Sequence, residues 1–377
     1  MNKILLVGAT GYVGGTVLTQ LLSSTSPALQ SQVFDVVVRK PEQVQKLQEE
    51  YGDRVRAFQW LGLDDTAFIE RLAGDYDIIV NTGTGFHAAA AIAFVQGQAH
   101  RITAGSLHTP WYINLSGCTN LATLPFSQPP VPIRRWDDLE DGAAIFEQLK
   151  KLESQDSYPQ RKAELGVLEL GERTGVQAVS VNVPVVFGEG EGLFNKQGTI
   201  IPRVMNYALQ HGYGFKLNET ANFDRVHVAD CAKIFELLVR AILERPDRGI
   251  GFIPVNEKGV IFAEAGHITI RELNQCCLDL LFEEGLLPKE GGPLKKEIRL
   301  CSVQELADKI ALGRTSIAER SWAGYKFTNS SVARKVLGWK PTRLDEAWRQ
   351  DFKDELAAMK EGRRIFTFAG VIGAETK

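Results

Sequence analysis

The sequence has no long apolar run and no segment typical of a targeting signal. No window of about 18 apolar residues occurs, so no helix is expected to cross a bilayer. The apolar stretch near the N-terminus covers only four residues before Gly8, which is too short for the core of a signal peptide. We therefore expect a cytosolic protein without membrane partners.

Cysteine is scarce, and charge of either sign is not in excess. The five cysteines are odd in number and include no CxxC pair, which predicts reduced thiols and argues against a disulfide framework or a metal site. Lys and Arg (43) nearly balance Asp and Glu (46), so the net charge is −3. No basic field is present to recruit nucleic acid.

The 377 residues exceed the size at which one core usually stops growing, so a second, smaller domain is expected. The first half alternates apolar, β-branched runs with segments of helical periodicity, which predicts an α/β fold with a doubly wound parallel sheet of the Rossmann type. We assign residues 1–185 with 222–255 to this domain. Residues 186–221 with 256–360 are predicted to form a mixed α/β substrate domain.

Proline-rich stretches and helix-capping motifs predict loops and helix starts in the rest of the chain. The passage LATLPFSQPPVPIRRWDD is rich in proline and is predicted to be a loop or flap. The stretches TIRE (from Thr269) and SVQE (from Ser302) fit the capping box, in which a hydroxyl and a Glu satisfy each other's amides, so each predicts a helix start.

A glycine pattern at the first strand-to-helix junction predicts dinucleotide binding. The stretch GATGYVGG places Gly8, Gly11 and Gly14 where backbone amides approach a pyrophosphate and a helix N-terminus stabilises its charge. The other residues of this loop assigned to the coenzyme site are Thr10, Tyr12 and Val13.

The end of the second predicted strand decides between the two dinucleotides. An acidic residue there would bind the adenosine ribose of NAD, but Arg39 and Lys40 occupy the position. A guanidinium matches a phosphate in charge and geometry, so NADP is favoured over NAD. Asp35 is a rival if the strand ends earlier, and Arg39 as a solvated loop charge is the plain alternative.

Two further turns are predicted to line the coenzyme, because ligands of such sheets bind at the carboxyl ends of the strands. Asp64, after the third strand, is placed to meet the adenine. Thr82, Gly83 and Thr84 follow the fourth strand along the expected path of the coenzyme.

The stretch SYPQRK places Tyr158 four residues before Lys162. Four residues span about one helical turn, so both side chains share a face, and Pro159 suits the first turn of a helix. The spacing alone also arises by chance in a chain with many basic residues.

Taken together, these stretches resemble the extended, epimerase-like branch of the short-chain dehydrogenase/reductase superfamily. The matching segments follow the order of that branch from residue 1 to about 350: GATGYVGG, YINLSG, YPQRKAE, NVPVVFGEGEG, DRVHVADCAKI and SSVARKVLGWKP. The resemblance implies that Tyr158 exchanges a proton with a carbonyl oxygen. It implies that Lys162 lowers the pKa of that phenol and holds the nicotinamide ribose.

The same resemblance implies further site residues and one departure. Pro184 and Val186 are expected to contact the nicotinamide, and a homodimer through a four-helix interface is expected by analogy. The branch usually carries a second Ser or Thr after the fifth strand, where this sequence has Gly117. Either Ser116 or Thr119 is expected to supply the missing hydroxyl.

These features predict an NADP-dependent oxidoreductase that reduces a ketone or aldehyde of a small organic molecule, with an aromatic or polycyclic compound as one option. One alternative is a sugar-nucleotide epimerase or dehydratase. It is weakened because Phe223 stands where such members carry an Arg for the diphosphate, and Arg225 is displaced by two residues. Another alternative is a redox-sensing regulator that binds NADP without turnover.

Overall fold

The computed structural model describes residues 2–83, 85–105, 108–245 and 252–363. A seven-stranded sheet, all of whose neighbouring strands are parallel, forms its centre, in the order β3-β2-β1-β4-β5-β7-β11. The order reverses at β1, which confirms the doubly wound Rossmann-type sheet predicted from the sequence. Its strands are β1 (Ile4–Val7), β2 (Phe34–Val38), β3 (Val55–Gln59), β4 (Ile78–Asn81), β5 (Trp111–Gly117), β7 (Gln177–Val183) and β11 (Val260–Phe262).

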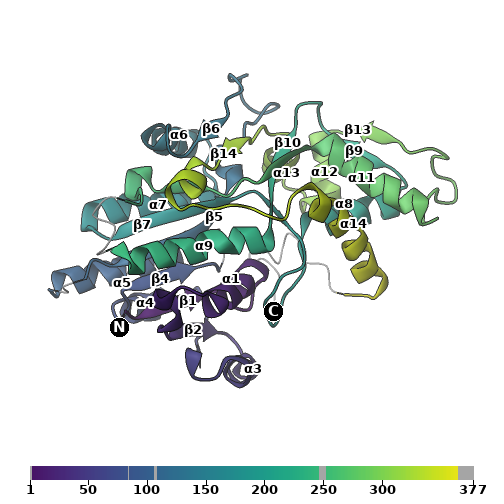
Figure 1. The fold of residues 1–377 in the computed structure, drawn as a ribbon. Coiled ribbons are helices and arrows are strands. Elements are labelled where there is room, and N and C mark those ends of the chain that lie inside the picture. Colours follow the sequence, from purple (N-terminus) through teal and green to yellow (C-terminus); the bar gives the residue numbers. More distant parts are fainter. Residues whose placement is uncertain (1, 84, 106–107, 246–251, 364–377) are drawn as a thin grey trace.

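Strands such as β1 and most of β2 are apolar because helices cover both faces of the sheet (Figure 1). In β1, Ile4 and Leu6 enter one core, while Leu5 and Val7 enter the other. The first face is covered by α1 (Tyr12–Ser23), α2 (Pro27–Gln30), α3 (Pro41–Tyr51) and α9 (Val228–Leu243). The second face is covered by α4 (Thr66–Ala73), α5 (Ala88–Thr103), α6 (Gly142–Gln155) and α7 (Pro159–Thr174).

A smaller lobe has its own apolar core and confirms the predicted mixed α/β second part. In Figure 1 its helices α8, α11, α12 and α14 lie together to the right of the sheet. Its helices are α8 (Ile200–His211), α11 (Ile270–Glu283), α12 (Val303–Ile310), α13 (Thr315–Trp322) and α14 (Asp345–Lys360). The remaining strands are β6 (Trp136–Asp137), β8 (Val185–Phe187), β9 (Gly214–Lys216), β10 (Asn222–His227), β12 (Gly266–Thr269), β13 (Ile298–Leu300) and β14 (Thr328–Asn329).

Small sheets link this lobe to the rest of the chain. Strand β10 pairs with β8 in parallel and with β12 in antiparallel orientation, β9 pairs with β13, and β6 pairs with β14. Short helical turns occur at η1 (Gly52–Arg54), η2 (Cys118–Leu121), η3 (Asn256–Lys258) and η4 (Val332–Val336). The domain boundaries assigned from the sequence stay a prediction.

The two predicted helix starts and the predicted proline-rich loop are present in the structure. Thr269 and Glu272 form a complete capping box at the start of α11. Ser302 caps α12 by accepting a hydrogen bond from the Glu305 amide. Residues 122–135 form neither helix nor strand, as expected for a loop.

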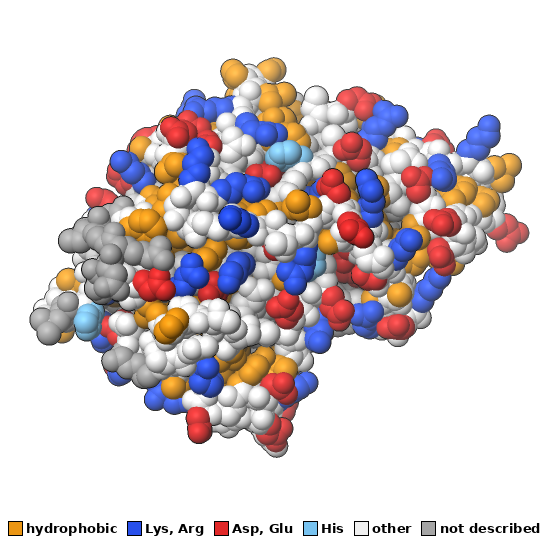
Figure 2. All heavy atoms as spheres, in the orientation of Figure 1, with side chains coloured by type: hydrophobic (Ala, Val, Ile, Leu, Met, Phe, Trp, Pro, Cys, Tyr) orange, Lys and Arg blue, Asp and Glu red, His pale blue; other side chains and the backbone are white. Residues whose placement is uncertain are grey.

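The surface carries charge of both signs. Figure 2 shows Lys and Arg intermixed with Asp and Glu across one face of the molecule. No helix in the described part of the chain combines the length and apolar character needed to cross a bilayer.

Candidate active site

The glycine loop between β1 and α1 packs tightly against the end of β4. Gly8 has φ +93°, and a Cβ on it would lie 2.6 Å from the carbonyl carbon of Thr82. A Cβ on Gly14 would collide with the Gly8 carbonyl oxygen and the Thr82 hydroxyl. Gly11 precedes the first helical residue and donates its amide to Gly8 O at 2.8 Å. These contacts pack the glycine loop against the end of β4 at the N-terminus of α1, which is the position expected for a pyrophosphate.

A loop from the second lobe lies across the start of α1. The Tyr12 hydroxyl donates to Gly188 O at 2.5 Å, and the Glu191 amide donates to the Thr16 hydroxyl at 3.0 Å. Thr10, Tyr12 and Val13 are partly buried at this junction. The stretch after β8 therefore forms a wall next to the glycine loop.

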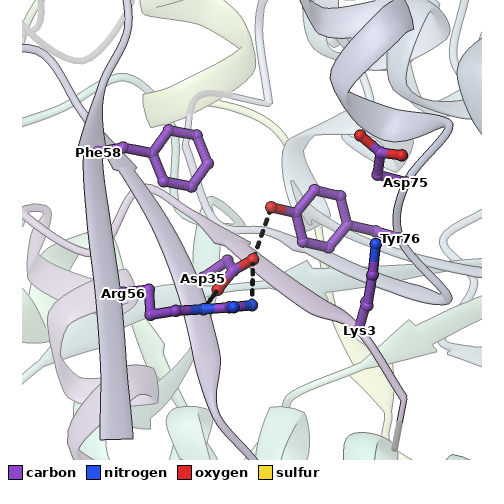
Figure 3. A pocket seen from close by; sticks show the side chains of 6 residues that line it. All are labelled: Lys3, Asp35, Arg56, Phe58, Asp75 and Tyr76. Atoms are coloured by element: carbon purple, nitrogen blue, oxygen red, sulfur yellow. Dashed lines mark hydrogen bonds and ion pairs between the residues drawn. The ribbon is translucent and has the colours of Figure 1, made fainter. Parts of the chain in front are cut away.

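Asp35 and Arg39, the two candidate residues at β2, lie at opposite ends of the strand. Asp35 is the second residue of β2, at the amino edge of the sheet, where it accepts a bidentate pair from Arg56 (2.7 and 3.0 Å) and the Tyr76 hydroxyl (2.8 Å) (Figure 3). Arg39 and Lys40 follow the last residue of β2 and have exposed side chains. Asp35 is thus unavailable at the edge that carries the glycine loop.

The other residues assigned to the coenzyme path lie in turns at the same carboxyl edge. The exposed Asp64 contacts His87 (Nε2 to Oδ1, 3.0 Å), which caps α5. Thr82 donates its hydroxyl to Val7 O at 2.7 Å, and the Gly83 amide donates to the Asn81 side chain at 3.1 Å. Thr82 therefore ties the end of β4 to β1, and Thr84 lies outside the described residues.

Tyr158 stands at the entrance of α7 with a hydroxyl neighbour from the turn after β5. It is the residue before Pro159, the first residue of the helix, and its hydroxyl oxygen lies 3.3 Å from Thr119 Oγ1. Thr119 belongs to the short turn η2 that follows the last residue of β5. The turn brings Thr119 beside the phenol at the carboxyl edge of the sheet.

Ser116, the other candidate hydroxyl, is occupied elsewhere. Its Oγ accepts from Asn120 Nδ2 at 2.9 Å, and Asn120 also donates to the buried Glu164 carboxylate. Burial raises the pKa of Glu164, while hydrogen bonds from this network oppose the rise. Ser116 is fully buried in the network, so the two candidate hydroxyls lie in different environments.

Comparisons with known proteins extend over nearly the whole chain. The sequence matches no protein-family model. A curated relative, the oxidase ucsJ of Acremonium sp, is 25% identical over 350 residues, which are 90% of this chain and 93% of that protein.

Solved structures share the fold at low identity. The dTDP-glucose 4,6-dehydratase DesIV from Streptomyces venezuelae, with NAD and TYD bound, aligns with a TM-score of 0.60, 13% identity and coverage of 96% of this chain and 98% of that chain. Vestitone reductase from alfalfa (Medicago sativa L.) aligns with a TM-score of 0.54 and 15% identity, and the alignment covers 97% of this chain and 100% of that chain. The yeast reductase Gre2, complexed with NADPH, aligns with a TM-score of 0.55 and 15% identity, and the alignment covers 96% of this chain and 100% of that chain. The chain has the fold of the extended short-chain dehydrogenases/reductases.

Within this extended short-chain dehydrogenase/reductase fold, two guanidinium groups flank the phenol. Arg320 Cζ lies 4.3 Å and Arg161 Cζ 5.9 Å from the centre of the Tyr158 ring, and Phe86 packs edge-on at 5.9 Å. Arg320 pairs with Asp156, and Arg161 pairs with Glu153 at 3.0 Å. These carboxylates hold the cations in place around the ring.

The pKa of Tyr158 differs from the sequence-based expectation of an acidic phenol. Burial raises this pKa, whereas the Thr119 hydrogen bond and the charges of Arg320 and Arg161 lower it by less. The side chain of Lys162 is exposed. The pKa rises because the loss of water around a phenol with 9% exposure outweighs the nearby positive charge.

The remaining assigned residues lie where β7 gives way to β8. Pro184 separates the two strands, and Val186 pairs with Val226 of β10. Two residues near the Tyr158 and Thr119 hydroxyls were not found from the sequence. Arg320 is far along the chain and carries no local signal, whereas Gln160 lies inside the YPQRK stretch, where only Tyr158 and Lys162 were assigned roles from the sequence.

Proposed function

We propose that this chain is an NADP-dependent oxidoreductase that reduces a ketone or aldehyde of a small organic molecule. The observation that carries the proposal is the 3.3 Å contact between the Tyr158 and Thr119 hydroxyls at the edge that holds the glycine loop. A phenol and a hydroxyl that lie side by side can both donate hydrogen bonds to the oxygen of a substrate carbonyl, which polarises the carbonyl group.

In this proposal the coenzyme lies along the carboxyl edge of the sheet. The glycine loop holds the pyrophosphate on the N-terminus of α1, and the exposed Arg39 and Lys40 bind the 2′-phosphate. Lys162 binds the nicotinamide ribose. A bound reduced nicotinamide supplies the hydride.

Tyr158 supplies the proton in the reduction. As the carbonyl carbon accepts a hydride with its electron pair, the carbonyl oxygen takes the proton of the Tyr158 hydroxyl, and an alcohol is formed. The phenolate left behind regains a proton from water. Arg320 and Arg161 stabilise the phenolate by their charge, and Thr119 holds the oxygen atoms in place.

Known relatives support this reaction class. The curated relative is named an oxidase, and two of the structural neighbours are named reductases, one of them in complex with NADPH. The flap before β6 adds exposed apolar side chains, namely Phe126, Val131 and Ile133. Such residues suit an apolar or aromatic substrate.

A sugar-nucleotide epimerase or dehydratase is the second candidate, because the dTDP-glucose dehydratase gives a TM-score of 0.60, above the two reductases. The environment of Arg225 argues against it. This guanidinium is buried, pairs with Asp345 and lies 5.1 Å from the Trp348 ring centre. Its burial and the pairing of Nη2 with Asp345 restrict its access to a diphosphate, although its buried Nε has no hydrogen-bond partner among the described residues.

The test is turnover of NADPH with a panel of carbonyl compounds, comparing the wild-type protein with Tyr158→Phe. We expect the variant to lose about 100- to 10,000-fold in kcat, the usual range for a general acid, and to keep its affinity for NADPH. Tight NADPH binding without turnover across the panel would instead favour the redox-sensing regulator. A nucleotide sugar that copurifies with the protein would favour the epimerase.

The proposal also includes a cytosolic homodimer. This part of the proposal rests on the resemblance to the extended branch of the short-chain dehydrogenases/reductases, for which a dimer is expected. Sedimentation equilibrium tests it, since a monomer has a mass of 41.7 kDa and a dimer twice that mass.

A further inference from the structure

The space beside Gly117 is filled by another side chain. A Cβ placed on Gly117 would lie 2.9 Å from both Nε2 and Oε1 of Gln160. Gln160 follows Tyr158 by two residues in α7, and its side chain is buried with 6% exposure. The amide of Gln160 therefore occupies the volume that a serine or threonine side chain at position 117 would need.

This amide is bonded to the hydroxyl next to the phenol. Thr119 Oγ1 donates to Gln160 Oε1 at 2.9 Å. Because a hydroxyl has a single proton, Thr119 then accepts from the Tyr158 hydroxyl at 3.3 Å. The three groups form a chain of hydrogen bonds that runs from Tyr158 through Thr119 to Gln160.

We propose that Gln160 is the positioning residue that holds the Thr119 hydroxyl against Tyr158, in place of the side chain that position 117 lacks. The inference rests on the proposed function, and it names the groups that complete its site. It explains together why residue 117 is glycine and why a glutamine lies inside the Tyr-x-x-x-Lys stretch.

The chemistry of an amide suits this position. With its oxygen toward Thr119, Gln160 accepts while Tyr158 keeps its proton. With its nitrogen toward Thr119, Gln160 donates, and Thr119 is free to donate to the phenolate after proton transfer. A half-turn of the amide thus lets one side chain support both protonation states of Tyr158.

The first test does not need a substrate. Tyrosinate absorbance, measured as the difference between each protein and its Tyr158→Phe counterpart, gives the pKa of Tyr158. Gln160→Glu can accept but cannot donate, so we expect it to raise this pKa. The rise should be larger when Thr119 is present than in the Thr119→Val background, where only the added charge acts.

Equal rises in the two backgrounds would overturn the inference, because Gln160 would then not act through Thr119. The result is independent of turnover, so it stands even if no carbonyl compound proves to be a substrate. Failure of the proposed function and failure of this inference are therefore distinguishable. The same pair of measurements with Gln160→Leu adds no charge. If Gln160→Leu changes the pKa of Tyr158 when Thr119 is present but not in the Thr119→Val background, the inference is supported.

The second test is a rescue of activity. We expect Gln160→Ala to lower kcat by about 10- to 100-fold with an unchanged KM for NADPH, as is common when a supporting residue is removed. Gly117→Ser alone should also lose activity, because its Cβ meets the Gln160 amide. The double variant Gly117→Ser, Gln160→Ala makes room for a hydroxyl near Thr119 and should recover most of the loss.

Thermal unfolding of the same variants distinguishes a loss of activity caused by a misplaced Thr119 hydroxyl from one caused by a less stable fold. If the double variant regains its melting temperature but stays as slow as Gln160→Ala, the inference is wrong, since a hydroxyl at position 117 does not replace the amide. Wild-type kcat in Gln160→Ala would overturn it as well.

Discussion

At the scale of single residues, opposing effects determine the protonation of Tyr158. Burial favours the neutral phenol, whereas the guanidinium groups of Arg320 and Arg161 favour the phenolate. Since burial dominates, the phenol keeps its proton at neutral pH. A neutral phenol is the form that a proton donor to a carbonyl oxygen requires.

Replacing Arg320 tests this balance. Arg320→Met removes the positive charge 4.3 Å from the ring centre and should raise the pKa of Tyr158 further. Oxidation of an alcohol requires the phenolate as a base, so its pH profile should move to higher pH in the variant. The measurement is the pH dependence of kcat/KM in the oxidation direction, together with the tyrosinate titration.

Arg320→Lys is the matched control, because it keeps the charge near the ring and should shift the profile less. Lys162→Met provides a comparison on the helix of Tyr158 itself. If Lys162→Met moves the pKa of Tyr158 more than Arg320→Met does, the exposed lysine and not the buried guanidinium is the main electrostatic partner of the phenol.

At the scale of elements, the sequence predicts the strands well because most are buried on both faces. Runs such as ILLV in β1 and FDVVV in β2 read as strands from composition alone, and Pro41 marks the start of α3. The position of Thr119 follows less directly, since it depends on the turn η2 after β5. The sequence therefore left Ser116 and Thr119 as equal candidates.

Contacts between distant elements could not be predicted in this way. Arg320, at the end of α13, reaches the Tyr158 ring only because the second lobe packs against the sheet domain. The burial of Tyr158, which reverses the expected direction of its pKa shift, depends on the same packing. Neither feature has a signal at short range in the sequence.

Helix α14 gives an element-scale prediction about pH. Its Asp351 accepts from the Gly188 amide at 2.9 Å, while Glu355 Oε2 is buried without a hydrogen-bond partner among the described residues. Burial raises the pKa of Asp351 to about 6 and that of Glu355 to about 8. Both carboxyl groups lie under the loop that crosses α1.

The sign of the effect follows from linkage. A carboxyl group whose pKa is higher in the folded state binds its proton more tightly there, so its contribution to stability is largest at low pH. That contribution is lost as the pH rises from the unfolded value of 4.5 through the folded value of about 8 for Glu355. The wild-type protein should therefore lose stability across this range.

Glu355→Gln should remove most of this pH dependence. We expect the variant to be more stable than the wild type near pH 8.5 by roughly 1–3 kcal/mol, because the introduced glutamine has no carboxyl group to ionise in this buried site. The gap should shrink near pH 5. Urea unfolding at both pH values measures it, with Glu346→Gln, an exposed site on the same helix, as the control. A gap that does not change with pH would contradict the assignment to Glu355.

At the scale of the whole molecule, the first turns of α1, directly after the glycine loop, contact the second lobe. The start of α1 contacts the loop after β8, and Gly188 and Gly198 of that loop bind the carboxylates of α14. A coenzyme bound as proposed would therefore lie next to contacts made by both lobes. Thermal unfolding of the whole chain is a suitable measure of coenzyme binding.

The coenzyme preference gives the prediction at this scale. At 100 times its dissociation constant a ligand stabilises the folded state by about 2.7 kcal/mol, so NADPH should raise the melting temperature measurably. NADH should raise it less at equal concentration, because it lacks the phosphate that Arg39 and Lys40 are proposed to bind. The double variant Arg39→Ala, Lys40→Ala should lose the NADPH advantage and respond equally to both coenzymes. Added salt should reduce the same advantage in the wild type, since both side chains are exposed and their charges are screened. A wild-type protein that responds to NADH as strongly as to NADPH at low salt would show that these two residues are ordinary solvated charges.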